Sequence, residues 1–235
     1  MNLLQSPLNA VKRGARILGG SDVYISKQLD CEVVYLGNLG ASWPICREAL
    51  PDKPLVYSFG VGEDISFDLE LIRLFDATIY AFDPTPGAIA WINGQQLPEN
   101  FHFHACGLAD HDGVSRFRAP INPAHVSHSM VAVKGAVPSC ELPVKRMQTI
   151  ISELRHPRVD LVKVDIEGAE YVVIDDFIAS GIFVKQLLVE FHHRWKEISV
   201  SKTKLAIRKL NAAGYRIFAT SPTGEEYGFL NLHAK

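Results

Sequence analysis

Four charged residues lie within eight positions in the segment Lys-Val-Asp-Ile-Glu-Gly-Ala-Glu: Lys163, Asp165, Glu167 and Glu170. One acid can cap a following helix and a second can lie in its first turn, but a helix start does not require three acids and a lysine. Carboxylates in this pattern can accept a proton from a hydroxyl, bind a substrate, orient the lysine or ligate a metal ion. We interpret Asp165, Glu167 and Lys163 as candidate catalytic residues.

Two adjacent histidines follow the next apolar segment, in the sequence Glu-Phe-His-His. Neighbouring side chains of an extended chain point in opposite directions, so one of His192 and His193 can face a cleft, and the sequence leaves open which. Histidine is the usual general base near neutral pH. We interpret His192 as the candidate base, Asp165 as the second choice, and Glu167 as orienting the substrate or Lys163. Metal ligation by His192 with Asp165 is a less favoured alternative, and we assign no metal ligands.

A Gly-x-Gly sequence lies between an apolar segment and a helical pattern. Gly60 and Gly62 would let the backbone approach a ligand at the carboxyl edge of a sheet, although a tight strand-to-helix turn explains the pair equally simply. Ile65 occupies the place of the third glycine of a dinucleotide fingerprint. This substitution argues against NAD, because the pyrophosphate of NAD must lie very close to the backbone at the start of the helix.

An acid and a second loop complete a pattern for an adenosine-like ligand. Asp83 lies 21 residues after Gly62, at the end of the next apolar segment, where a carboxylate can accept hydrogen bonds from both ribose hydroxyls. Its alternative role is to cap the short helix that follows. Gly107 and Leu108 follow a third such segment, where the backbone could contact an adenine or could form only a turn.

Short apolar segments alternate with helical patterns along most of the chain. We expect strands at 54–59, 78–82, 101–106, 159–164, 184–191, 215–220 and 227–232, and helices at 66–75, 86–93, 147–154, 168–177 and 203–213. This alternation predicts an α/β fold with a doubly wound, mostly parallel sheet covered on both faces. Only a short turn separates the last two strands, which should therefore pair antiparallel as a hairpin at one side of the sheet.

The chain shows no internal repeat and no linker rich in Pro, Gly or Ser, which favours one domain. We expect an N-terminal extension at 1–50, a domain at 51–235, and an irregular insertion with short strands at about 107–144. Connections as long as this insertion are usually functional lids or mobile. The extension and the insertion are the segments that we expect to shape an acceptor pocket.

The composition argues against several classes of protein. The 235 residues are 47% hydrophobic and 21% charged, close to an average soluble globular protein, and the formal net charge is -2. A dedicated nucleic-acid binder usually has a basic excess, so we expect no nucleic-acid partner. No run of about 18 apolar residues predicts a membrane span. Four cysteines without a CxxC pair, and no signal-peptide pattern, favour reduced thiols and a cytoplasmic location.

Four segments together resemble the FkbM family of S-adenosylmethionine-dependent methyltransferases. They are Val-Tyr-Ser-Phe-Gly-Val-Gly-Glu-Asp-Ile-Ser-Phe at 56–67, Ala-Phe-Asp-Pro-Thr-Pro at 81–86, Val-Asp-Leu-Val-Lys-Val-Asp-Ile-Glu-Gly-Ala-Glu at 159–170, and Leu-Val-Glu-Phe-His-His at 188–193. The resemblance runs from about residue 54 to the C-terminus, and Lys-x-Asp-x-Glu-Gly-x-Glu is its most specific part. It implies a class I methyltransferase fold of the Rossmann-like type, S-adenosylmethionine as cofactor, and O-methylation of sugar or natural-product hydroxyls as the commonest activity.

The resemblance also assigns the residues above to two halves of one site. The cofactor half has Gly60 and Gly62 at the methionine part, Asp83 at the ribose, and Gly107 and Leu108 at the adenine, and the substrate half has Asp165, Glu167 and His192.

The chain departs from the family at two places. Many members carry an acid at the position of Ser58, two residues before the first glycine, and many carry the third glycine that is missing here. We expect Glu63 and Asp64 to supply the lost polar contacts with the amino group of the cofactor.

These observations favour an S-adenosylmethionine-dependent O-methyltransferase whose partner is a small-molecule acceptor such as a sugar or glycan. A non-catalytic module that keeps the cofactor pocket is the main alternative. An NAD-dependent oxidoreductase is the least favoured, because the complete glycine fingerprint and a Tyr-x-x-x-Lys pair are both missing. The sequence carries no readable code for the acceptor or for the oligomeric state.

Overall fold

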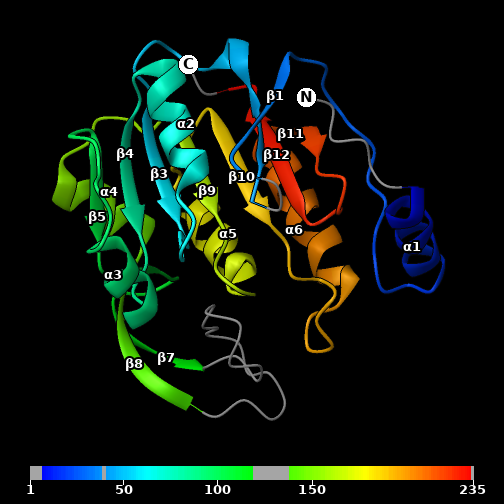
Figure 1. Cartoon of the computed structure of the whole chain (residues 1–235). Coiled ribbons are helices and arrows are strands. Elements are labelled where there is room, and N and C mark those ends of the chain that lie inside the picture. The colour runs from blue at the N-terminus through cyan, green and yellow to red at the C-terminus, as the bar shows by residue number, and fades with distance from the viewer. Residues whose placement is uncertain (1–6, 39–40, 119–137, 234–235) are drawn as a thin grey trace.

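A seven-stranded sheet with the order β11-β12-β10-β9-β3-β4-β5 forms the centre of the computed structural model, which describes residues 7–38, 41–118 and 138–233 (Figure 1). Its strands are β3 (Leu55–Phe59), β4 (Thr78–Phe82), β5 (Phe101–His104), β9 (Leu161–Val164), β10 (Gln186–Glu190), β11 (Tyr215–Thr220) and β12 (Glu226–Asn231). β12 lies between β10 and β11 and is antiparallel to both, whereas the other neighbouring pairs are parallel. The predicted doubly wound sheet and its antiparallel C-terminal hairpin are confirmed.

Three helices pack on one face of this sheet: α4 (Met147–Leu154), α5 (Glu170–Ala179) and α6 (Val200–Ala212). Alternate strand residues such as Tyr57, Phe59 and Val162 point into this layer and are almost completely buried. α5 contributes Val173 and Phe177, which lie on one face of the helix because they are four residues apart. Each such side chain stabilises the fold by roughly 2 kcal/mol through its burial.

The other face is covered by α2 (Ser66–Phe75), α3 (Pro86–Ile92) and a hairpin of β1 (Val33–Leu36) and β2 (Trp43–Cys46), which a short 3-10 helix (Arg47–Ala49) follows. The side-chain amide of Gln186 in β10 both donates to the carbonyl of Cys46 and accepts from its N–H, which anchors the hairpin to the sheet. Because strand side chains alternate between the faces, Ser58, Lys163 and Glu190 lie on this second face. Three polar residues are thereby enclosed under the hairpin and α2.

The N-terminal segment contains α1 (Pro7–Leu18) and runs beside the C-terminal strands (Figure 1). The backbone N–H groups of Gln28 and Leu29 donate to the carbonyl of Ile217 in β11. Val11 and Leu18 on α1 are exposed, so only part of its apolar surface packs on the body of the protein. Among the described helices, none is long and apolar enough to cross a membrane.

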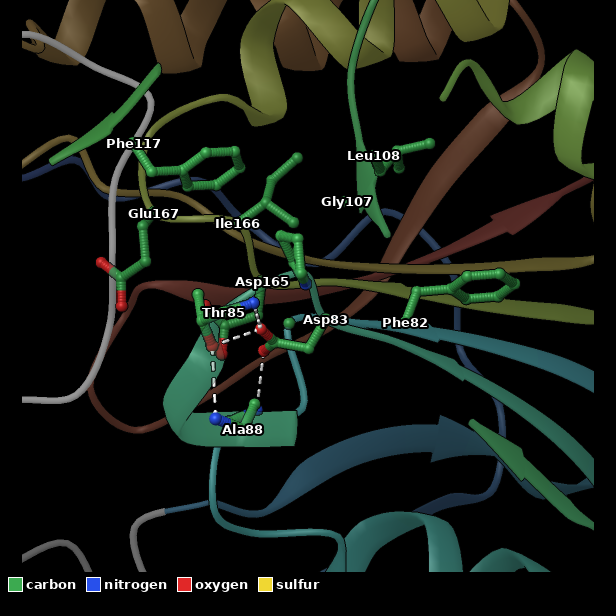
Figure 2. A pocket seen from close by; sticks show the side chains of 13 residues that line it. Phe82, Asp83, Thr85, Ala88, Gly107, Leu108, Phe117, Asp165, Ile166 and Glu167 are labelled. Atoms are coloured by element: carbon green, nitrogen blue, oxygen red, sulfur yellow. Dashed lines mark hydrogen bonds between the residues drawn. The ribbon is translucent and has the colours of Figure 1, made fainter. Parts of the chain in front are cut away.

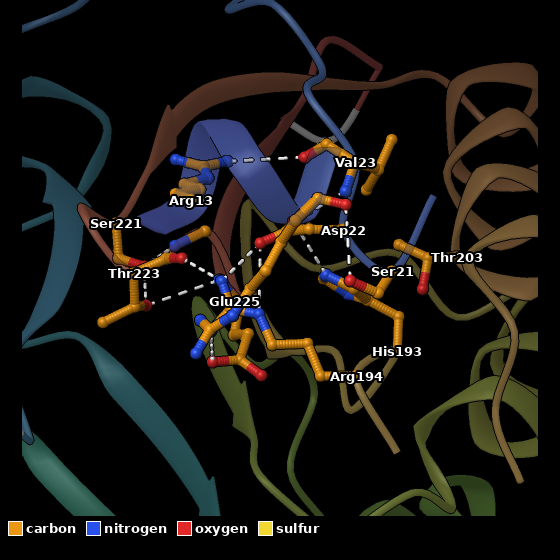
Figure 3. Close-up of polar contacts among 12 residues, drawn as sticks. Arg13, Ser21, Asp22, Val23, His193, Arg194, Thr203, Ser221, Thr223 and Glu225 are labelled. Carbon is orange, nitrogen blue, oxygen red and sulfur yellow. Dashed lines mark hydrogen bonds and ion pairs between the residues drawn. The ribbon is translucent and has the colours of Figure 1, made fainter. Parts of the chain in front are cut away.

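A buried polar network ties this segment to the loop after β10 (Figure 3). The Asp22 carboxylate lies 3.1 Å from Nε2 of His193 and accepts hydrogen bonds from Nε and Nη2 of Arg194. Arg194 also contacts Glu225 and the carbonyl of Thr223 in the turn between β11 and β12. Although burial alone would raise the pKa of Asp22, its hydrogen bonds with Arg194 and His193 lower it. The network therefore favours the charged form of Asp22 and joins three distant segments of the chain.

The insertion forms a small sheet of β6 (Gly107–Leu108), β7 (Gly113–Arg118) and β8 (Pro138–Lys145), in the order β6-β8-β7. The predicted short strands at 107–144 are confirmed for the described part, and residues 119–137 lie outside it. Phe117 of β7 and Val144 of β8 pack together at the base of this sheet. The base adjoins the carboxyl ends of the central strands.

Element ends differ from the predicted ones by a few residues. The predicted helix at 168–177 begins only at Glu170, because Glu167 and Gly168 both have positive φ angles of 53° and 94° and cannot continue a right-handed helix. α6 begins three residues earlier than predicted, at Val200, after the extended residue Ser199. The first residues of α6 are mostly polar, so the apolar pattern of the sequence did not indicate where the helix begins.

Candidate active site

A cleft opens at the carboxyl ends of the central strands, where ligands bind in open α/β sheets (Figure 2). Its lining combines three loops and the insertion: Gly60, Gly62, Phe82, Asp83, Pro84, Thr85, Ala88, Gly107, Leu108, Phe117, Asp165, Ile166 and Glu167. Seven of the predicted site residues are among them: Gly60, Gly62, Asp83, Gly107, Leu108, Asp165 and Glu167. Residues separated by more than 100 positions in the sequence thus surround one space.

The two glycines of the first loop serve different purposes. Both have positive φ angles, 74° at Gly60 and 52° at Gly62. A Cβ on Gly60 would lie 1.6 Å from the carbonyl oxygen of Asp165, whereas a Cβ on Gly62 would meet no atom within 4 Å. Gly60 therefore lets the ends of β3 and β9 approach each other, and Gly62 is the glycine that leaves the cleft open to a ligand.

Asp83 is buried at the end of β4 and connects the glycine loop to α3. One carboxylate oxygen accepts from the backbone N–H of Gly62 at 3.0 Å, and the other accepts from the N–H and hydroxyl of Thr85 at 2.9 and 2.6 Å (Figure 2). Thr85, not Asp83, is the N-cap of α3. A carboxylate has about four acceptor positions, so three protein contacts leave about one for a ribose hydroxyl. We therefore expect Asp83 to accept a hydrogen bond from one ribose hydroxyl and not, as the sequence suggested, from both.

The loop after β5 closes the far end of the cleft. A Cβ on Gly107 would lie 3.1 Å from the ring of Pro84 and 3.3 Å from Val144, so a larger residue would press on both walls. Leu108 is buried beside it, and Phe117 of the insertion lies close by. Sequence reasoning missed Phe117, and its only signal there was its place in an alternating segment. These apolar groups suit the flat face of a purine.

A strained turn follows β9 and positions two predicted catalytic acids. The N–H of Asp165 donates to the carbonyl of Phe59, which holds Asp165 beside the glycine loop. Glu167 has φ 53°, a left-handed conformation that a non-glycine residue rarely adopts and that costs about 1–3 kcal/mol. Both side chains line the cleft. Such strain persists only where the surrounding structure fixes the conformation, and here it accompanies the placement of Asp165 and Glu167 on the cleft wall.

His192 is held against these acids by Glu170 of α5. One oxygen of the fully buried Glu170 accepts from the N–H of His192 at 2.9 Å and lies 3.2 Å from its Nδ1, and the other accepts from Gly168. The opposite ring nitrogen, Nε2, lies 3.4 Å from Glu167 and 4.0 Å from Asp165. His193 points away, toward Asp22, which confirms that the two histidines face opposite directions. The sequence block contained Glu170, but nothing in it indicated that Glu170 orients a histidine.

The charges around His192 stabilise a positive charge at this corner. Burial alone would lower the pKa of His192, but its hydrogen bond to Glu170 and the charges of Glu170, Glu190 and Glu167 raise it to about 10. Burial and the charge of Asp165 raise the pKa of Glu190 to about 9. Several carboxylates thus converge on one small volume.

A second cavity lies on the other side of Gly60, under the N-terminal hairpin. It is lined by Ala41, Trp43, Gly60, Val61, Asp64, Phe67, Asp68, Lys163, Asp165, Glu190 and Glu226. Nζ of Lys163 donates to the carbonyl of Gly60 at 3.2 Å, lies 4.9 Å from the ring centre of Trp43, and lies 3.9 Å from Asp165. Lys163 therefore braces the glycine loop against Asp165, and Gly60 and Asp165 belong to both cavities.

Asp68 is an acid of this second cavity that sequence reasoning missed. It lies on the buried face of α2, and its Oδ1 has no hydrogen-bond partner in the described part of the chain. Burial raises its pKa to about 6, although the charge of Lys163 acts in the opposite direction. A signal was available, because Asp68 precedes Leu71 by three residues and so occupies an apolar position of the helix. An acid at such a position indicates a polar site beneath the helix.

The two acids expected at the cofactor amino group lie differently. Asp64 lines the second cavity, where it accepts from the N–H of Ser66 at 2.7 Å at the start of α2 and from the side chain of Asn38. Glu63 is exposed and lines neither of the two cavities. The structure thus brings Asp64 to the site and leaves Glu63 at its rim.

Comparisons with known proteins find relatives that are named as methyltransferases. The chain is 26% identical over 176 residues to a probable methyltransferase-like protein 24 of Rattus norvegicus, which covers 70% of this chain and 42% of that protein. It is 22% identical over 174 residues to the Homo sapiens protein of the same name, covering 69% of this chain and 41% of that protein. The chain spans less than half the length of these curated relatives.

Among solved structures, the FkbM methyltransferase of Methylobacillus flagellatus is similar at a TM-score of 0.49 and 14% identity, covering 76% of this chain and 44% of that one. The family model described as the methyltransferase FkbM domain matches residues 44–217, well over half of the sequence and every cleft segment described above. The chain belongs to the FkbM methyltransferase domain family.

Proposed function

We propose that this protein transfers the methyl group of S-adenosylmethionine to a hydroxyl of a sugar or natural-product acceptor. The observation that carries the proposal is the single cleft that joins the glycine loop, Asp83 and the loop at Gly107 to the acids Asp165 and Glu167. The first three features suit an adenosine, and the two acids lie where a second substrate can meet it. Family membership supports methyl transfer as the reaction.

The two cavities match the two ends of the cofactor. The adenosine would occupy the cleft between Asp83 and Leu108, and the methionine part would reach past Gly60 into the second cavity. There Asp68 and Asp64 could bind the ammonium group of the methionine part, and Lys163 could bind its carboxylate. In this arrangement Asp68, which comes from α2, replaces the acid that the family often carries at the position of Ser58.

Bound S-adenosylmethionine would supply an activated methyl group. An acceptor hydroxyl in the cleft would take this group in line, with the electron pair of the broken S–CH₃ bond staying on sulfur and S-adenosylhomocysteine as the second product. The protein contributes mainly positioning, because the positive sulfur already activates the methyl group. The raised pKa keeps His192 protonated near neutral pH, so its predicted role as the base does not fit this corner. We assign removal of the hydroxyl proton to the carboxylates Asp165 and Glu167, which the His192 ring orients, and assign Lys163 to positioning Asp165.

Replacing Asp83 by Asn tests the cofactor half of the site. The variant keeps the shape of the side chain but removes the charge that the ribose hydroxyl and the N–H of Gly62 share. We expect S-adenosylmethionine to bind about 10- to 100-fold more weakly, the value of a hydrogen bond to a charged group. Isothermal titration measures this change, with NAD as the control ligand and Asp110→Asn, an exposed acid outside the cleft, as the control variant. Unchanged affinity in Asp83→Asn would remove Asp83 from the cofactor site.

Replacing His192 by Asn tests the substrate half. We expect turnover to fall about 100-fold while the cofactor dissociation constant stays within about twofold, because His192 faces the acids of the cleft and lines neither cavity directly. Formation of S-adenosylhomocysteine with a panel of sugars and phenolic acceptors measures turnover, and His111→Asn, at an exposed histidine, is the matched control. An equal loss of cofactor binding would contradict this division of the site.

The non-catalytic alternative makes a different prediction in the same assay. A binding module would hold S-adenosylmethionine without forming S-adenosylhomocysteine with any acceptor of the panel. The strained Glu167 turn favours the enzyme, since a module that only binds the cofactor has no use for an acid held in a costly conformation.

A further inference from the structure

Three side chains from two neighbouring strand ends form a candidate ligand set, to which the structure adds Glu190 beside the pair His192 and Asp165 that the sequence suggested. One carboxylate oxygen of Asp165, one of Glu190 and a ring nitrogen of His192 all lie within 4.8 Å of one another. Ligands about a single ion at 2.0–2.2 Å are about 3 Å apart when adjacent and about 4.3 Å apart when opposite. The three atoms therefore need only small shifts to contact one ion.

The histidine is prepared in the way that metal-binding histidines usually are. Its Nδ1 lies against the buried Glu170 carboxylate, which also accepts from the backbone N–H of the same residue. A carboxylate behind the ring fixes its orientation and directs the other nitrogen forward. Nε2 of His192 consequently faces the acids of the cleft, 3.4 Å from Glu167 and 4.0 Å from Asp165, and its side chain is only 9% exposed.

The surroundings leave a place for positive charge. Nζ of Lys163 lies 3.9 Å from Oδ2 of Asp165, whereas Oδ1 is the oxygen that faces His192. Asp68 is almost fully buried, lines the same cavity as Asp165 and Glu190, and keeps an oxygen without a hydrogen-bond partner in the described part of the chain. An unpaired buried oxygen indicates a ligand or water in the cavity.

We propose that Asp165, Glu190 and His192 bind a divalent metal ion of the Mn²⁺ type at the junction of the two cavities. Two carboxylates neutralise a dication, and the addition of an imidazole to the set favours Mn²⁺ over Mg²⁺, whose ligands are mostly oxygens. The ion deepens the proposed function and rests on it for its role, although not for its binding. It would hold the acceptor oxygen and lower the pKa of the hydroxyl, whose proton would pass to Glu167 on the cleft wall.

Metal binding can be measured without any acceptor. The whole chain is stripped with EDTA, desalted and titrated with Mn²⁺, and free Mn²⁺ is followed by electron paramagnetic resonance and the heat by calorimetry. We expect one Mn²⁺ per chain and a Mn²⁺-dependent rise in Tm. Glu190→Gln and Asp165→Asn should each weaken binding at least roughly tenfold, because each removes a charged ligand.

Glu226→Gln is the matched control for Glu190→Gln. Glu226 lies directly opposite Glu190 across the β10–β12 pair and lines the same cavity, but it is not one of the three ligands. We expect this variant to retain Mn²⁺ affinity within about threefold, a difference of under 1 kcal/mol. If Mn²⁺ affinity fell equally in both variants, the metal ion would be attracted by the acidic cavity in general and not bound by the three ligands. That result would overturn the proposed site.

Titration of the metal-free protein with S-adenosylmethionine separates the two proposals. Cofactor binding without any Mn²⁺ binding overturns the metal site and leaves the proposed function intact. Selective Mn²⁺ binding without cofactor binding supports the metal site and overturns the proposed function.

Discussion

Gly60→Ala should destabilise the protein by about 3 kcal/mol or more and abolish cofactor binding. A left-handed backbone costs a non-glycine residue about 1–2 kcal/mol, and forcing extra atoms into a packed region costs a further 1–3 kcal/mol. The new methyl group would lie 1.6 Å from the carbonyl oxygen of Asp165 and 2.8 Å from its carbon, both backbone atoms. β3 and β9 would have to separate at the point where the two cavities meet.

Gly62→Ala is the control for this variant. Gly62 has a positive φ of the same kind, but its Cβ would meet no atom within 4 Å. The free energy of unfolding of this variant should therefore fall by only about 1–2 kcal/mol, the cost of the left-handed backbone. Its methyl group enters the cleft, so the cofactor should bind more weakly. Urea unfolding and isothermal titration of both variants measure the two effects. Equal stabilities would show that the contact with Asp165 does not determine the requirement for glycine at position 60.

Asp22→Ala should lower the free energy of unfolding by about 3–5 kcal/mol, the usual result of removing one partner of a buried charged pair. The side chains of Asp22 and His193 are fully buried, and Arg194 is only 17% exposed. Without the carboxylate, Arg194 keeps its contacts to Glu225 and Thr223, which places the expected loss near the lower end of the range. His193 would lose the acceptor for its Nε2.

The network also positions the loop that carries His192. Turnover in Asp22→Ala should fall even at temperatures where the variant is folded, because the residues next to His192 lose their anchor. Thermal unfolding and turnover are measured together, with Asp30→Ala as the control, since Asp30 is a fully exposed acid on the same segment paired with Lys27. A stability unchanged from wild type would mean that Asp22 contributes nothing beyond a surface contact.

The order and type of the regular elements could be predicted because they depend on local patterns. The apolar strand ending at Phe59 and the helix at Ser66–Phe75 follow from their apolar patterns, and the final antiparallel hairpin follows from its short turn. The start of α5 could not be predicted, because the left-handed turn at Glu167 is maintained by contacts elsewhere in the fold. Local propensity contains no information on such strain.

The cleft could be predicted in outline for a topological reason. Loops that follow parallel strands meet at one edge of the sheet, so Gly62, Asp83 and Asp165 had to lie near one another once the strand order was inferred. How each side chain is used was not predictable. Asp83 accepts three hydrogen bonds from groups of the protein itself, and Glu63 lies outside both cavities.

The sequence by itself determined the fold class, the family resemblance and most of the residues around the cleft, because each depends on residue type and spacing along the chain. Only the tertiary structure decided which histidine faces the acids, that Glu170 holds it, and that Asp68 and Glu190 enclose a second cavity with Lys163. Packing of α2, the N-terminal hairpin and β10 creates these contacts between segments far apart in the chain. The interactions between these charged side chains depend on their distances in the folded protein, which cannot be read from their spacing along the sequence.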